Sequence, residues 1–211
     1  MDIRNTPIEP ERFYHLYNRG VNGEIIFKTE RNMLFFLEKI KENLLPVSDI
    51  YAYCLMPNHF HFLLQIKSEE ELKSLDKVQN LDKATNSALG VQNLDKAKTG
   101  LHASQNIFSK QFSRVFNSYS QAFNKENNRH GALIESPFKR KLITDENYLR
   151  QCIIYIHQNP TFDDFTTYPY SSYTEILSSS ETFIKRAEVI ELFEDKENFI
   201  VCHQKTTNFE F

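Results

Sequence analysis

Tryptophan is absent from this 211-residue chain, and cysteine is scarce. The three cysteines (Cys54, Cys152 and Cys202) are odd in number and far apart, so they predict neither a disulfide framework nor a zinc motif. No apolar run approaches the roughly 20 residues that a membrane span needs, and the N-terminal residues show no apolar signal segment. These absences argue against a disulfide scaffold and a membrane protein, and we expect a cytoplasmic protein in a reducing compartment.

A strong excess of charge is also missing, because the formal net charge is only −3. Composition alone therefore does not indicate a nucleic-acid-binding protein, and any such site must come from a local basic cluster. Hydrophobic residues make up 40% of the chain, with 18 Phe and 10 Tyr, which is enough for a core. We expect one domain over 1–211, with a core at about 11–175, a polar insertion at about 75–104 and a helical tail at 176–211.

Hydrophobic periodicity predicts an α+β fold. The expected elements are strands at 11–20, 47–56 and 59–66, a strand or extended arm at 133–143, and helices at 29–46, 69–75, 106–127, 146–158 and 184–193, with frayed residues at the C-terminus. This order is typical of a ferredoxin-like (RRM-like) antiparallel sheet with helices on one face.

The insertion contains a short duplication. Residues 78–84, with the sequence VQNLDKA, recur without change at 91–97. Two copies at this short period are too few for a solenoid, so we interpret the segment as a tolerated polar surface insertion.

The central feature of the sequence is a histidine pair, His59 and His61, in a run of aromatic and aliphatic residues. Side chains alternate along a strand, so both imidazoles are expected on one face, with Phe60 and Phe62 facing a core. Two neighbouring imidazoles suit one divalent ion, although a bare His-x-His also occurs in ordinary half-buried strands.

The helix at 146–158 brings further candidates. Tyr155 and Asn159 are four residues apart and share one helix face. Asn159, or alternatively His157, could supply a third metal ligand, and Tyr155 would then point at the ion. A tyrosine hydroxyl beside a divalent ion is a suitable nucleophile towards phosphorus. Tyr119 is the competing nucleophile, but it lies on the apolar stripe of its own helix.

Basic residues suggest where a phosphate backbone would bind. Lys139, Arg140 and Lys141 form the densest basic cluster of the chain, and Arg129 lies about ten residues before it. Arg19, at the end of the first strand, is a further candidate. A solvated basic surface is the competing interpretation of all five residues.

Several motifs together resemble a known family, the single-tyrosine HUH transposases. Met56 to Leu64 resembles the His-hydrophobe-His motif, and Tyr155 to Pro160 resembles the tyrosine-bearing helix. The remaining similar segments, in order with these two, are 14–20, 131–141 and 168–173, the last with tyrosine where the family has tryptophan. The small insertion-sequence transposases and those associated with repetitive extragenic palindromes (REP) are the most similar members.

This resemblance implies an HUH endonuclease that nicks and rejoins single-stranded DNA with hairpin ends through a 5′-phosphotyrosine. His59, His61 and Asn159 would hold Mg²⁺ or Mn²⁺, and Tyr155 would be the nucleophile. Some members of the family pair as homodimers and others are monomers, so a homodimer stays open for this chain. The insertion and the low net basicity depart from the family pattern.

Three other functions compete with this one. A non-catalytic module could bind single-stranded DNA or RNA by stacking, without metal or Tyr155. A replication-initiator or relaxase-like nickase would share the chemistry, and a water-using metal nuclease would leave Tyr155 as a packing residue.

Overall fold

The computed structural model describes residues 6–75, 101–160 and 163–205, with backbone only for 101–106. The duplicated segment lies outside these residues. The long helix α3 begins at Leu101, earlier than the predicted start at 106. In chain order the elements are β1 (Phe13–Arg19), η1 (Val21–Gly23), α1 (Glu30–Leu44), β2 (Ser48–Met56), β3 (His59–Ile66), a helix at 69–75, α3 (Leu101–Glu126), β4 (Lys139–Ile143), α4 (Glu146–His157), α5 (Ser172–Leu177), α6 (Arg186–Leu192) and α7 (Lys196–His203).

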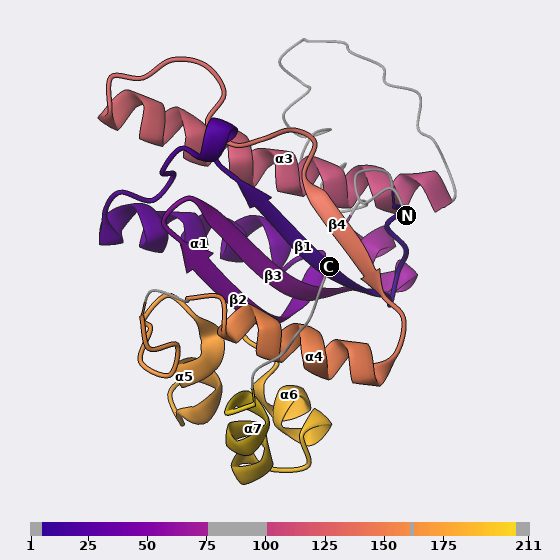
Figure 1. Cartoon of the computed structure of the whole chain (residues 1–211). Helices are drawn as coiled ribbons and strands as arrows, with labels where there is room; N and C mark the ends of the chain where they lie inside the picture. The colour runs from indigo at the N-terminus through magenta and orange to yellow at the C-terminus, as the bar shows by residue number, and fades with distance from the viewer. Residues whose placement is uncertain (1–5, 76–100, 161–162, 206–211) are drawn as a thin grey trace.

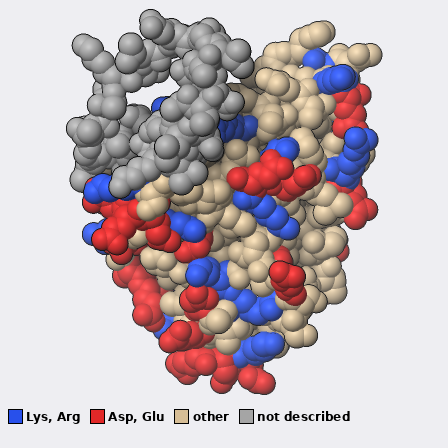
Figure 2. All heavy atoms as spheres, turned by 180° about the vertical axis from the view of Figure 1, so that it is seen from behind, with Lys and Arg blue, Asp and Glu red and all other residues tan. Residues whose placement is uncertain are grey.

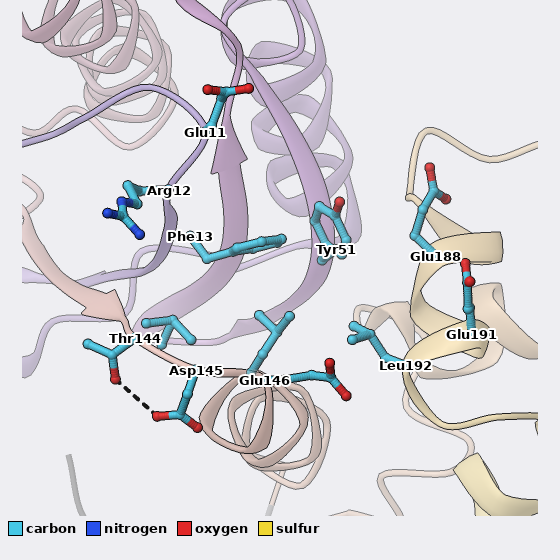
Figure 3. A pocket seen from close by; sticks show the side chains of 12 residues that line it. Glu11, Arg12, Phe13, Tyr51, Thr144, Asp145, Glu146, Glu188, Glu191 and Leu192 are labelled. Carbon is cyan, nitrogen blue, oxygen red and sulfur yellow. Dashed lines mark hydrogen bonds between the residues drawn. The ribbon is translucent and has the colours of Figure 1, made fainter.

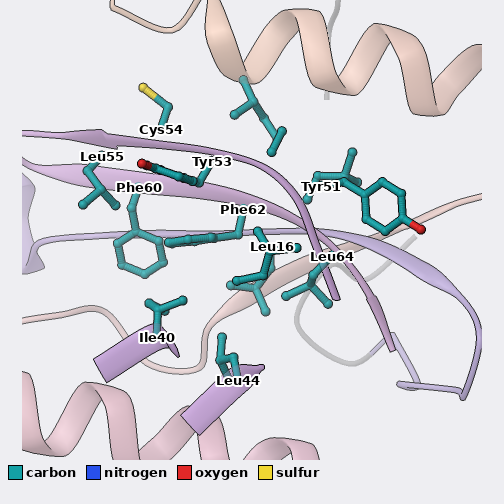
Figure 4. Packing of buried hydrophobic residues seen from close by; sticks show 14 of the residues in the cluster. Leu16, Ile40, Leu44, Tyr51, Tyr53, Cys54, Leu55, Phe60, Phe62 and Leu64 are labelled. Atoms are coloured by element: carbon teal, nitrogen blue, oxygen red, sulfur yellow. The ribbon is translucent and has the colours of Figure 1, made fainter. Parts of the chain in front are cut away.

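The four strands form one antiparallel sheet in the order β2-β3-β1-β4, as the ferredoxin-like prediction requires. Helices α1 and α3 cover one face of the sheet, and α4 lies across the other (Figure 1). Figure 4 shows Phe60, Phe62 and Leu16 directed towards Ile40 and Leu44 of α1. The sheet is therefore covered on both sides, and the histidines of β3 lie on the side of α4.

Local sequence explains how the key elements begin. The Thr29 side chain accepts a hydrogen bond from the Asn32 backbone N–H and caps α1, and Asp145 caps α4 in the same way through the Tyr148 N–H. Pro57 and Asn58 form the turn between β2 and β3. The Pro57 carbonyl accepts from the Ile26 and Phe27 N–H groups, which fixes the start of β3.

Gly20 is needed where β1 ends. Its backbone N–H donates to the Asn58 carbonyl at 2.8 Å. A Cβ atom at this position would lie 2.0 Å from the Glu24 carbonyl oxygen, so only glycine fits there. This close approach holds the Arg19 end of β1 against the turn that precedes His59.

Two boundaries differ from the sequence prediction. The segment predicted as a strand or extended arm at 133–143 forms a strand only from Lys139, and the described residues before it pair at the end of β1 through one isolated bridge, between Gly20 and Ile134. The C-terminal region contains two helices, α6 and α7, where we predicted one helix and a frayed end. In α7, Phe199 and His203 are completely buried. No helix among the described residues is long and apolar enough to cross a membrane.

Candidate nucleotidyl-transfer site

His59 and His61 lie on β3, an inner strand of the sheet. His61 pairs with Tyr17 of β1, and His59 pairs with Arg19. Both imidazoles are on the face opposite Phe60 and Phe62, as strand alternation predicts. Their ring centroids are 5.2 Å apart, with His61 buried and His59 half-buried.

His59 contacts an oxygen atom at each ring nitrogen. Its Nδ1 lies 2.7 Å from Asn58 Oδ1, and its Nε2 lies 3.2 Å from Asn159 Oδ1. Burial lowers the His59 pKa; the Asn159 contact opposes this shift, and the Arg19 charge adds to it. A neutral imidazole carries a proton on only one of its two nitrogens. The unprotonated nitrogen of His59 therefore points its lone pair at an asparagine oxygen, to which it cannot hydrogen-bond. With the proton on Nδ1, Nε2 and Asn159 Oδ1 are two electron donors that a cation would join.

Tyr155 approaches the histidines from α4. Its ring centroid is 5.6 Å from that of His61 and 6.0 Å from that of His15, edge-on in both cases. Asn159 follows just after the helix end, and its Nδ2 donates to the Tyr155 carbonyl at 3.3 Å. The structure therefore brings together His59, His61, Tyr155 and Asn159, as the sequence predicted.

His157, the alternative third ligand, faces away from the histidine pair. Its Nδ1 is 2.8 Å from His203 Nε2, and its Nε2 is 2.8 Å from Ser172 Oγ. Both ring nitrogens are thus occupied in a buried network with α7 and α5. The alternative is wrong, and Asn159 is the residue that reaches the site.

Tyr119, the competing nucleophile, lies on the opposite side of the sheet. It packs against Phe36 of α1, and its hydroxyl donates a short hydrogen bond to the Ile26 carbonyl. Burial raises the Tyr119 pKa well above that of free tyrosine. The nearest rival to Tyr155 is instead Tyr17, whose ring stacks on His61 at 5.7 Å.

His15 is the site residue that the sequence analysis missed. It lies on β1, is 1% exposed, and its Nε2 is 2.8 Å from His61 Nδ1. The sequence did place His15 in the first predicted strand, between Tyr14 and Leu16, and so on one face of the sheet. Its pairing with His61 depends on the strand register, which the sequence did not reveal.

The predicted phosphate-binding residues divide into two groups. One group lies on the sheet face that carries His59 and His61, here called the histidine face, and consists of Arg19, Lys139 and Lys141. On this face the Glu135 carboxylate bridges two of the cations, with Arg19 Nε at 2.7 Å and Lys139 Nζ at 3.1 Å. Lys141 Nζ lies 5.3 Å from the centre of the Tyr148 ring.

The other two predicted residues have structural contacts elsewhere. Arg140 faces the opposite side of the sheet, and its Nε donates to the Thr6 carbonyl at 2.6 Å. Arg129 pairs with Glu24 and donates to the Ala132 carbonyl at 2.7 Å. Figure 2 shows basic and acidic side chains interspersed on the far side of the molecule, without one continuous basic surface.

A divalent ion fits the chemistry of the histidine site. Within the described residues, no cluster of three or more His, Cys, Asp or Glu side chains could hold a metal alone. The available donors are two imidazoles and the Asn159 amide oxygen. Such an incomplete set leaves coordination positions for water and phosphate oxygens, as in sites where Mg²⁺ or Mn²⁺ acts on phosphates.

A separate groove of the described structure lies away from the histidine pair and has a different lining. It has a volume of about 570 Å³, and apolar residues such as Phe13, Tyr51 and Leu192 line it together with the carboxylates of Glu11 and Glu191 (Figure 3). Additional carboxylates come from Asp145, Glu146 and Glu188. Although Arg12 also lines the groove, its five carboxylates would repel a phosphate, so it does not have the charge expected of a nucleic-acid site.

The fold and the site define a mixed α+β protein with a paired-histidine face beneath a tyrosine-bearing helix. No protein-family model and no curated protein matches the chain. Among solved structures, it resembles a REP-associated tyrosine transposase bound to a REP hairpin, at a TM-score of 0.52. The match covers 85% of this chain and 86% of the other at 12% sequence identity, and it bears out the family resemblance at the level of the fold.

Proposed function

We propose that this chain is a transposase-like HUH endonuclease that nicks and rejoins single-stranded DNA through a 5′-phosphotyrosine at Tyr155. The observation that carries the proposal is the convergence of two separate segments on one face. β3 supplies His59 and His61, and α4 brings Tyr155 within 5.6 Å of the His61 ring and Asn159 within 3.2 Å of His59 Nε2. A binding module without catalysis has no need for this arrangement.

In the proposed reaction, His59, His61 and Asn159 would hold Mg²⁺ or Mn²⁺, and the bound ion would supply Lewis-acid neutralisation of charge on the scissile phosphate. The Tyr155 oxygen bonds to phosphorus and releases its phenolic proton to solvent. The bond between phosphorus and the 3′-oxygen breaks, and that oxygen leaves as a 3′-hydroxyl after taking up a proton. Attack by a 3′-hydroxyl on the phosphotyrosine reverses the sequence and rejoins strands.

The proposed DNA path crosses the cations on the same face. Arg19 is paired with His59 across β1 and β3, and Lys139 and Lys141 continue the face on β4. A phosphate near His59 would therefore meet positive charge on one side. The solved structure of similar fold is bound to a REP hairpin, so we propose single-stranded DNA with a hairpin as the substrate.

A covalent-adduct assay tests this function. Labelled single-stranded hairpin DNA from the region flanking the gene is incubated with protein and Mn²⁺, then separated under denaturing conditions. We expect a protein–DNA adduct with wild type and with Tyr119→Phe, and none with Tyr155→Phe or with EDTA. Tyr119→Phe is the matched control, because it removes a tyrosine hydroxyl on the other side of the sheet.

Two outcomes would contradict the proposal. Cleavage that survives Tyr155→Phe without an adduct would indicate a nuclease that uses water. Hairpin binding without cleavage or adduct, under all metal conditions, would indicate a single-strand-binding module.

A further inference from the structure

His15 makes a direct side-chain contact with one member of the histidine pair. Its Nε2 lies 2.8 Å from His61 Nδ1, and the two rings are nearly parallel at 12°, with centroids 5.1 Å apart. The contact joins neighbouring strands, β1 and β3, and both residues are buried. Neither ring can turn without breaking this hydrogen bond inside the protein.

The number of protons on the two rings is limited. Both side chains are buried, at 1% and 6% exposure, and burial disfavours the charged imidazolium form. A separation of 2.8 Å between His15 Nε2 and His61 Nδ1 leaves room for one proton between them, so one ring donates and the other accepts.

We propose that His15 is a positioning residue that accepts a hydrogen bond from His61 Nδ1–H and thereby leaves His61 Nε2 as an unprotonated metal ligand. The reverse arrangement, with His15 as the donor, would put the remaining His61 proton on Nε2 and block coordination there. A second partner that fixes the ring and tautomer of a ligating histidine is a general requirement of metal sites. This inference rests on the proposed function for the identity of the metal site, but the tautomer is a property of the protein itself.

Two further contacts favour a positioning role over simple packing. The Tyr17 ring stacks on His15 at 4.8 Å and on His61 at 5.7 Å, so it keeps the two imidazoles in one orientation. Tyr155 meets both imidazoles edge-on. His15 thus touches the ligand, the stacking ring and the proposed nucleophile.

Nitrogen-15 NMR of the imidazole groups tests the inference in metal-free protein. In wild type at pH 7 we expect His61 with its proton on Nδ1, and His15 likewise. His15→Gln places a carbonyl acceptor near the same position and should keep the His61 tautomer. His15→Leu removes the acceptor and should release His61 into a mixture of tautomers, with the thermal unfolding transition as a check on folding.

Mn²⁺ titration by calorimetry adds a second readout. We expect His15→Leu to weaken Mn²⁺ binding by about 10- to 100-fold, and His15→Gln to restore most of the loss. A wild-type His61 with its proton on Nε2, or unchanged tautomer and Mn²⁺ affinity in His15→Leu, would overturn the inference. Failure of the DNA adduct alone, with these results intact, would instead overturn the proposed function.

Discussion

At the scale of single residues, the two candidate tyrosines have separable roles. The Tyr119 hydroxyl satisfies the buried Ile26 carbonyl, so Tyr119→Phe leaves that acceptor without its donor. We expect this change to lower the free energy of unfolding by about 1–3 kcal/mol, measured by urea denaturation. Adduct formation by the folded variant should stay at the wild-type level; a loss of adduct without a loss of stability would contradict the assignment of Tyr119 to the core.

Single residues also show what the sequence could reveal about the site. Strand alternation predicted that His59 and His61 share a face, and helical spacing predicted that Tyr155 and Asn159 share another. His15 was missed because its role depends on the register between β1 and β3. His157 could be excluded only when the structure showed its contacts with His203 and Ser172.

At the scale of elements, a buried histidine network holds α4, the helix that carries Tyr155, on the side away from the sheet histidines. His203 Nδ1 donates to the Phe199 carbonyl at 2.7 Å, which makes its Nε2 the acceptor for His157 Nδ1–H. Ser172 at the start of α5 then donates to His157 Nε2. Helices α4, α5 and α7 are therefore held together by neutral imidazoles, on the side of α4 away from the histidine pair.

This network predicts a pH dependence of stability. Burial lowers the His203 pKa from 6.5 to about 4, among the rings of His157, Phe165, Tyr173, Phe193 and Phe199. Between pH 6.5 and pH 4, His203 is protonated in the unfolded chain but stays neutral in the folded chain. The free energy of unfolding therefore falls as the pH drops from 6.5 to 4. His203 alone should account for about 3 kcal/mol of that fall.

A matched variant isolates this contribution. His203→Gln retains a carbonyl acceptor for His157 but cannot titrate, so its unfolding free energy should depend less on pH over the same interval. Urea denaturation at several pH values measures both proteins. Equal slopes for wild type and His203→Gln would contradict the role given to His203.

Most elements followed from the sequence, and the exceptions have physical causes. The periodic apolar stripes of α1, α3 and α4 predicted these helices. Helix α7 was not predicted because it has almost no amphipathic pattern. One of its two completely buried residues, His203, is polar, so the sequence shows no apolar stripe there. The predicted start of the fourth strand, at 133, was also too early. Pairing with β1 determines that β4 begins at Lys139, and the sequence alone does not show this pairing.

At the scale of the whole molecule, the net charge of −3 means that the proposed DNA binding has to use a local basic face. Arg19, Lys139 and Lys141 lie on that face, and Arg140, the neighbour of Lys141, lies on the other. Three phosphate contacts on single-stranded DNA predict a slope of about −2 for log affinity against log salt concentration. Lys141→Ala should make the slope shallower by about 0.7, and Arg140→Ala should leave it unchanged.

Fluorescence anisotropy with a labelled hairpin at several salt concentrations measures these slopes. Equal reductions for Lys141→Ala and Arg140→Ala would show that binding does not follow the histidine face. The acidic groove near Phe13 and Leu192 should make no contribution, because its carboxylates repel phosphate.

The residue that carries the DNA in the covalent adduct identifies the nucleophile. The adduct formed with Mn²⁺ can be digested with nuclease and protease, and the nucleotide located by mass spectrometry. We expect one 5′-linked nucleotide on the Tyr155 oxygen. A nucleotide on Tyr17, the ring stacked on His61, or on any residue other than Tyr155, would contradict it.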